Sequence, residues 1–222
     1  MVSKIAVVTI GQAPRKDMAS DMRQLKNTGL DVTEFGILDL LSMLEIEALA
    51  PNAQDTDILV TLLTNGQQVK LSKKKLLPLV EKRMLDLQEF TWILLMCTGD
   101  FANALTAKNL LLPDRMLTYL IQGIRKDVRL GLIGPEPEQR TSVTEKWQKA
   151  NFEFTFAASS PYHFDKHDLL AKAKLLEQQG AELLILDCMG YSNTMKNHIK
   201  NELNIPVIVP REAILNILTT IH

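Results

Sequence analysis

Short, almost wholly apolar runs alternate along the chain with longer segments whose apolar residues recur every three or four positions. Such a run is typical of a strand covered on both faces, and its alternation with helical segments is typical of parallel α/β folds. The runs predict strands at residues 5–10, 58–63, 92–96, 129–133, 183–187 and 206–209. The chain is therefore expected to be an α/β protein with mainly parallel sheets.

Local signals add helices and one hairpin to this pattern. Helical periodicity covers residues 35–49, 72–87 and 166–179, and Gly180 stands where a helix C-terminus commonly takes a left-handed residue. Asn65-Gly66 separates two apolar runs, which is the strongest short hairpin signal. A small antiparallel hairpin is expected within residues 58–72.

The chain also contains a weak internal repeat. A strand that ends in Gly and leads into a Pro-bearing turn occurs at residues 5–14 and again at 128–137. Later in each half an apolar strand runs directly into a Cys-x-Gly sequence, at Cys97 and at Cys188. The repeat predicts two pseudo-symmetric, three-layer α/β lobes with an interlobe cleft. Both cysteines would lie at the carboxyl ends of strands, where open α/β sheets bind ligands.

Two matched thiols suggest a particular chemistry. A thiol between a strand end and a helix N-terminus lies near backbone N–H groups that lower its pKa. Two such thiols on opposite sides of one molecule remove a proton from one face of a carbon atom and deliver one to the other. The glycines after them let backbone N–H groups approach a carboxylate or an enolate. The alternative is that each cysteine is simply a small buried side chain, which is common for this residue type.

Composition and charge exclude several classes of protein. The 222 residues are 46% hydrophobic and 23% charged, as in ordinary folded proteins. The net charge of −1 provides no basic excess for binding nucleic acid. Two cysteines cannot build a disulfide framework, and no apolar run reaches the length of a membrane span. These features predict a cytoplasmic protein that binds neither nucleic acid nor membrane.

Motifs for cofactors and metals are also absent from the sequence. No phosphate-binding glycine motif for ATP or NAD follows any predicted strand. His163 and His167 have the spacing of a metal pair but lack the glutamate that accompanies it in an H-E-x-x-H motif. No cofactor and no metal are expected.

Four segments together resemble the AroM family over essentially the whole chain. They are Gly11-Gln12-Ala13-Pro14-Arg15-x-Asp17, Cys97-Thr98-Gly99-x-Phe101, Leu186-Asp187-Cys188-Met189-Gly190-Tyr191 and Pro206-Val207-Ile208-Val209-Pro210-Arg211. That family is similar to the aspartate/glutamate/hydantoin racemase superfamily. The resemblance implies two α/β lobes with one catalytic cysteine in each, no cofactor or metal, and a last strand and helix that return to the first lobe. The first lobe would then comprise residues 1–115 with 205–222 and the second 116–204; a homodimer is compatible with the resemblance.

The candidate site residues follow from these segments. Cys97 and Cys188 are the expected acid and base. Arg15 follows a strand, a glycine and a turn, a context that binds anions, and Arg211 follows another strand end. The other candidates for holding a substrate flank the arginines or the thiols: Gly11, Gln12, Asp17, Thr98, Gly99, Met189, Gly190 and Tyr191. Asp17 is equally suited to stabilising a helix N-terminus. The alternative for Arg15 is an exposed arginine paired with Asp17 or Asp21.

The residues and the resemblance together predict a protein similar to a cofactor-independent racemase or isomerase, which would act on a small carboxylate-bearing molecule by proton transfer between two thiols. Amino-acid racemases of the superfamily typically carry Cys-Asn-Thr and Cys-Thr-His, whereas the runs here are Cys97-Thr98-Gly99 and Cys188-Met189-Gly190. Free aspartate or glutamate is therefore not the expected substrate. Two alternatives stay open: a decarboxylase or cis–trans isomerase that uses one thiol, and a non-catalytic protein that binds a small anion.

Overall fold

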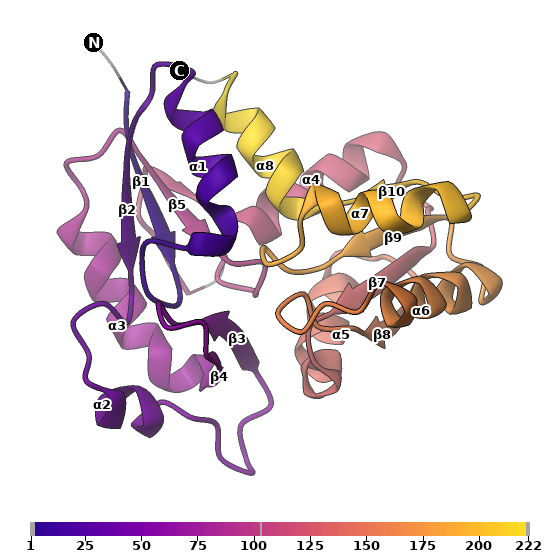
Figure 1. Ribbon diagram of the computed structural model, residues 1–222, viewed down its shortest axis with the longest axis horizontal. Coiled ribbons are helices and arrows are strands. Elements are labelled where there is room, and N and C mark those ends of the chain that lie inside the picture. Colours follow the sequence, from indigo (N-terminus) through magenta and orange to yellow (C-terminus); the bar gives the residue numbers. More distant parts are fainter. Residues whose placement is uncertain (1–2, 103, 221–222) are drawn as a thin grey trace. The chain divides into compact units, whose positions relative to one another are not determined.

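The computed structural model describes residues 3–102 and 104–220. The chain divides into two compact units, one comprising residues up to Asp114 together with those from Leu215 onward, the other Arg115–Ile214. Figure 1 shows a sheet flanked by helices in each unit. Helices α4 (Pro113–Ile124) and α8 (Pro210–Leu218) carry the chain across the boundary between the units.

The first unit contains a four-stranded parallel sheet and a separate hairpin. The sheet has the order β2-β1-β5-β6, with β1 (Lys4–Thr9), β2 (Asp31–Gly36), β5 (Trp92–Met96) and β6 (Leu110–Leu111). The antiparallel hairpin pairs β3 (Ile58–Leu62) with β4 (Gln68–Ser72), as the Asn65-Gly66 signal predicted. The helices are η1 (Lys16–Met18), α1 (Ala19–Lys26), α2 (Met43–Ala48) and α3 (Lys73–Asp86).

The second unit contains a parallel sheet with the order β10-β9-β7-β8. Its strands are β7 (Leu130–Gly134), β8 (Phe154–Ala158), β9 (Leu183–Leu186) and β10 (Val207–Ile208). Its helices are η2 (Pro137–Gln139), α5 (Arg140–Lys149), α6 (Lys166–Gln178), α7 (Asn193–Ile199) and η3 (Lys200–Glu202).

The alternation of side chains along each central strand produces the layers. In the first unit, Ala6 and Val8 pack with α3, whereas Val7, which lies between them, faces the methionines of η1 and α1. In the second unit, Ile133 packs with α6, and the neighbouring Leu132 packs with α4 and α5. Each sheet is therefore covered by helices on both faces, which explains why its central strands are apolar throughout.

The internal repeat is confirmed by the order of the strands. Read as β8-β7-β9-β10, the second sheet repeats the order β2-β1-β5-β6 of the first. In each unit the second strand of the sheet lies on one side of the first strand, and the third lies on the other side. This reversal creates a switch point between β1 and β5 in the first unit and between β7 and β9 in the second. Cys97 directly follows β5 and Cys188 follows β9, so both thiols lie at switch points.

Local signals in the sequence fix the ends of several helices. The Ser42 side chain and Glu45 form a capping box at α2, and the Ser72 hydroxyl caps α3. Helix α6 ends in a Schellman motif, in which the N–H of Ala181 donates to the carbonyl of Leu176 and Gly180 has a φ of +90°. The predicted helix 166–179 and its terminating glycine are thus confirmed.

The structure corrects three sequence expectations. The predicted helix 35–49 is wrong: β2 runs to Gly36, the carboxylate of Asp39 accepts the N–H of Gly36 in the following turn, and only Met43–Ala48 is helical. Strands β2, β6 and β8 were not predicted. Residues 205–214 differ from the expected lobe assignment, because β10 pairs with β9 of the second sheet. No helix within residues 3–102 and 104–220 has the length and apolar character needed to cross a bilayer.

Candidate active site

The two cysteine turns have the same local geometry. In both turns the cysteine N–H donates to the carbonyl oxygen two residues earlier, with an N···O distance of 2.7 Å. The N–H of the glycine two residues later is directed at the sulfur, 3.4 Å from Sγ of Cys97 and 3.3 Å from Sγ of Cys188. A backbone donor aimed at sulfur stabilises a thiolate. The N–H groups of Gly99 and Gly190 therefore contact the thiols, and their expected approach to a substrate stays a prediction.

Cys97 lies in largely apolar surroundings. The residue is 9% exposed and belongs to the core of the first unit. A Cβ atom at Gly99 would lie 3.0 Å from Cδ2 of Leu59 and 3.5 Å from the ring of Phe101, so both side chains reach this turn. Thr98, between cysteine and glycine, is 7% exposed. Burial among apolar atoms opposes the charged form of a thiol. The N–H of Gly99 therefore favours the thiolate of Cys97, whereas the apolar surroundings disfavour it.

Cys188 is half-buried and has a polar neighbour that the sequence did not indicate. The hydroxyl of Tyr162, in the loop between β8 and α6, lies 3.6 Å from Sγ of Cys188. A Cβ atom at Gly190 would lie 2.8 Å from the Tyr162 ring and 2.9 Å from Pro161, so glycine is needed for this loop to pack on the turn. Met189, between cysteine and glycine, is buried.

Tyr191 is buried and its hydroxyl donates to the carbonyl of Ser159. The N–H of Ser159 in turn donates to the carbonyl of Gly134 at the end of β7. Desolvation raises the pKa of Tyr191 well above its ordinary value, and the charges of Cys188 and Tyr162 raise it further. The phenol therefore stays protonated and holds the end of β8, rather than pointing to an open site.

A buried ion pair lies directly before the second thiol. The carboxylate of Asp187 accepts from Nζ of Lys146 at 2.6 Å and from Nε1 of Trp147 at 2.9 Å. The side chain of Asp187 is 0% exposed and that of Lys146 is 9% exposed. In the repeat, the position of Asp187 corresponds to Met96 in the first unit, so the polar group is particular to the second turn.

In the first unit, Arg15 is anchored by neighbouring side chains. Its guanidinium binds the carboxylate of Asp17 through two hydrogen bonds of 2.8 Å, and it donates to the hydroxyls of Thr9 and Thr61 at 3.2 and 3.3 Å. Its side chain is 7% exposed. Arg15 therefore ties β1, the following turn and the hairpin together.

The hairpin packs closely against the same turn. A Cβ atom at Gly11 would lie 2.4 Å from Oγ1 of Thr61 and 2.5 Å from the carbonyl of Leu62. The side-chain oxygen of Gln12 accepts from the N–H and the hydroxyl of Thr64. Gly11 and Gln12 thus contact the hairpin.

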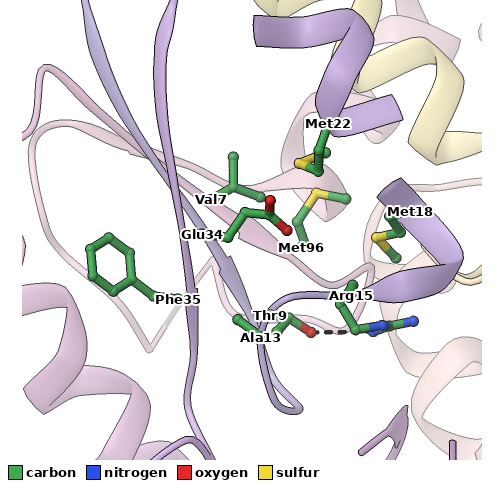
Figure 2. A pocket seen from close by; sticks show the side chains of 9 residues that line it. All are labelled: Val7, Thr9, Ala13, Arg15, Met18, Met22, Glu34, Phe35 and Met96. Carbon is green, nitrogen blue, oxygen red and sulfur yellow. Dashed lines mark hydrogen bonds between the residues drawn. The ribbon is translucent and has the colours of Figure 1, made fainter. Parts of the chain in front are cut away.

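Figure 2 shows a cavity beside Arg15 in the first unit, on the face of the sheet covered by η1 and α1. Its lining residues are Val7, Thr9, Ala13, Arg15, Met18, Met22, Glu34, Phe35 and Met96. The centre of a water molecule can occupy about 10 Å³ of it, which is room for roughly one water. This cavity is too small for a carboxylate substrate.

The predicted site residues gather at the two turns and at the Arg15 anchor. Arg211 is 2% exposed and lies in the first turn of α8, in the second unit. Among residues 3–102 and 104–220, no group of three or more His, Cys, Asp or Glu is placed to hold a metal ion. Tyr162 and Lys146 were missed by the sequence reasoning. The acidic Asp187 inside an otherwise apolar strand run was the one available signal of a buried partner.

Comparisons with known proteins agree with this fold. Residues 5–221 match the model of a family described as AroM protein. Picrophilus torridus aspartate racemase is 12% identical with a TM-score of 0.59, over 98% of this chain and 93% of that one. Unliganded arylmalonate decarboxylase is 12% identical with a TM-score of 0.62, over 98% of this chain and 93% of that one. The maleate isomerase Iso from Pseudomonas putida S16 is 11% identical with a TM-score of 0.64, over 99% and 92%. No curated protein matches the chain by sequence.

Proposed function

The chain belongs to the AroM family, and we propose that it is a cofactor-independent racemase or isomerase that moves a proton at a carbon atom next to the carboxylate of a small molecule. The observation that carries the proposal is the pair of matched Cys-x-Gly turns at the switch points of two repeated sheets. A core cysteine needs neither a glycine N–H on its sulfur nor a counterpart in the other unit.

In the proposed reaction the two thiols act on opposite faces of one carbon atom. One thiolate takes the proton, and the electron pair of the C–H bond passes into the adjacent carboxylate as an enolate. The other thiol then gives its proton to the opposite face, which inverts the centre and leaves the second sulfur as the thiolate. Both sulfurs need a stabilised charged form, because each is a thiolate on one side of the reaction. The glycine N–H groups supply this in both turns.

The proposed substrate class draws support from the similar structures. The names aspartate racemase, arylmalonate decarboxylase and maleate isomerase share a carboxylate on the molecule transformed. Thr98 and Met189, each between a catalytic cysteine and its glycine, are the nearest candidates for contacting this carboxylate. Arg15, Asp17, Gln12, Gly11, Tyr191 and Arg211 are proposed to shape and support the site around it.

Two other functions are each favoured by a specific observation. The thiols are unequal, since Cys97 is buried in the apolar core while Cys188 is half-buried beside Tyr162. This inequality favours a decarboxylase or cis–trans isomerase in which Cys188 is the single reactive thiol. The packing of Cys97 in the apolar core of the first unit would suit a non-catalytic protein that binds a small anion and in which the cysteines only fill strand ends.

Solvent exchange separates these functions. Aspartate, phenylmalonate and maleate are incubated with the protein in D2O, and incorporation of deuterium is followed by NMR for wild type, Cys97→Ser, Cys188→Ser and the double variant. The two-thiol proposal predicts that inversion of the centre is lost in both single variants, while the remaining thiol can still exchange the proton on its own face. A complete reaction that survives Cys97→Ser supports the one-thiol reaction and contradicts the proposal. Protection of wild type and double variant alike against thermal unfolding by these compounds, without exchange in either, supports anion binding and also contradicts it.

A further inference from the structure

The two thiols share one backbone geometry but differ in side-chain environment, and one of the differences is the hydroxyl of Tyr162 beside Cys188. This residue comes from the loop after β8, a separate segment from the Cys188 turn, and 26 positions separate the two residues in sequence. Its hydroxyl faces Sγ at 3.6 Å. We propose that Tyr162 is a positioning residue that donates to the Cys188 thiolate and makes Cys188 the base of the resting protein. The inference rests on the proposed function and extends it by assigning which thiol starts the reaction.

The direction of the hydrogen bond follows from the ordinary pKa values of the two groups. A phenol titrates near 10 and a thiol near 8.5, so the sulfur loses its proton first and the phenol then donates to it. The N–H of Gly190 is a second donor at 3.3 Å. Two donors from different elements therefore converge on one sulfur, and hydrogen bonds to a charged acceptor are the stronger kind.

The charged groups around the turn do not replace this contribution. Asp187, next to the thiol, is neutralised by Lys146 of α5 at 2.6 Å. Tyr191 stays protonated because its pKa is raised by burial. Asp168 of α6 contributes to that rise, and its carboxylate would oppose a nearby negative charge rather than favour it. His163, which follows Tyr162, is exposed.

The packing of Gly190 gives an independent argument that the contact is built into the fold. A Cβ atom at this position would lie 2.8 Å from the Tyr162 ring and 2.9 Å from the Pro161 ring. An alanine would have to push both rings away from the turn, so the glycine allows the loop to bring the hydroxyl to the sulfur. By contrast, a Cβ atom at Gly123 in α4 would meet nothing within 4 Å.

The test is the pH dependence of Cys188 alkylation by iodoacetamide, with each cysteine followed by peptide mass spectrometry. Loss of one hydrogen bond to a charged acceptor should raise the apparent pKa of Cys188 in Tyr162→Phe by roughly one unit, a tenfold lower rate at neutral pH. The limiting rate at high pH should be unchanged, because the thiolate itself is intact. Gly190→Ala should shift the profile in the same direction, and the Cys97 profile should not move in either variant.

Controls use the other members of the same residue types. Tyr119 is 65% exposed on α4, so Tyr119→Phe should leave both profiles as in wild type, as should Gly123→Ala. An unchanged Cys188 profile in folded Tyr162→Phe would overturn the role of Tyr162 while leaving the two-thiol reaction intact. A Cys188 that is unreactive in the folded wild-type protein would overturn both, so the two failures are distinguishable.

Discussion

The buried ion pair before the second thiol leads to the sharpest prediction about stability. In Lys146→Met the carboxylate of Asp187 keeps its bond from Trp147 but loses the ammonium group 2.6 Å away. Both side chains are almost fully excluded from water, at 9% and 0% exposure. Removing one partner of such a pair leaves a buried charge without its counter-ion and costs about 3–5 kcal/mol of unfolding free energy.

An exposed ion pair provides the matched control. Lys82 and Asp86 lie 3.0 Å apart on α3, with side chains 75% and 48% exposed. An exposed pair four residues apart on a helix contributes about 0.3–0.5 kcal/mol, so Lys82→Met should have a small effect. The contrast between the two lysines follows from burial alone, because their carboxylate partners are of one chemical type.

Urea unfolding followed by tryptophan fluorescence is the assay, in a Trp92→Phe background so that the signal comes from Trp147. The double variant Lys146→Met, Asp187→Asn removes both charges and keeps an acceptor for Trp147. It should be less destabilised than Lys146→Met alone, because no isolated charge remains. A loss below about 1 kcal/mol in Lys146→Met, or a double variant no better than the single one, would refute the reasoning.

Three further predictions concern the remaining contacts. Gly11→Ala places a Cβ atom 2.4 Å from Oγ1 of Thr61 and should destabilise the protein by about 1–3 kcal/mol in calorimetry. An unchanged thermal midpoint would contradict this and show that the hairpin moves away from the new methyl group without cost. Gly180→Ala forces a φ of +90° on an L-residue and should lower the urea midpoint, which a Gly180→Asn variant should partly restore. The hydrogen bonds of Ser42 lower the pKa of Glu45, so their stabilisation exists above the unfolded-state pKa and is lost as the pH falls through the lower folded-state value. Ser42→Ala should therefore lose more stability at pH 7 than in strong acid, where only the pH-independent bond from the Glu45 N–H to Ser42 is missing, and an equal deficit at all pH values would contradict this.

The sequence was sufficient to predict features that depend on short segments. The apolar runs placed the central strands, Asn65-Gly66 predicted the hairpin, and Gly180 marked the end of α6. The repeat predicted equivalent sheets because a strand that ends in a Cys-x-Gly turn is visible within one short stretch.

The edge strands β2, β6 and β8 and the long-range contacts were not predictable in this way. Strand β2 lies at a sheet edge and carries charged residues on both faces, at Asp31 and Glu34, so its pattern gave no apolar run, and the following apolar residues suggested a helix. The bond between Arg15 and Thr61 spans 46 residues, and that between Trp147 and Asp187 spans 40. No local pattern encodes such pairs; only the packing of helices and hairpin on the sheets brings them together.

The central claim is that the two matched turns hold functional thiols, and their reactivity in the native protein tests it most directly. The measurement is the rate of alkylation of each cysteine against pH, in wild type, Cys97→Ser and Cys188→Ser, before and after unfolding in urea. The account predicts that native Cys188 reacts with an apparent pKa well below about 8.5, the value of an unperturbed thiol. Cys97 should react more slowly than Cys188 because it is only 9% exposed. It should nevertheless react in the folded protein, before urea unfolds it. If both thiols are inert until the protein unfolds, the two-thiol account is wrong and the cysteines only fill the ends of the strands.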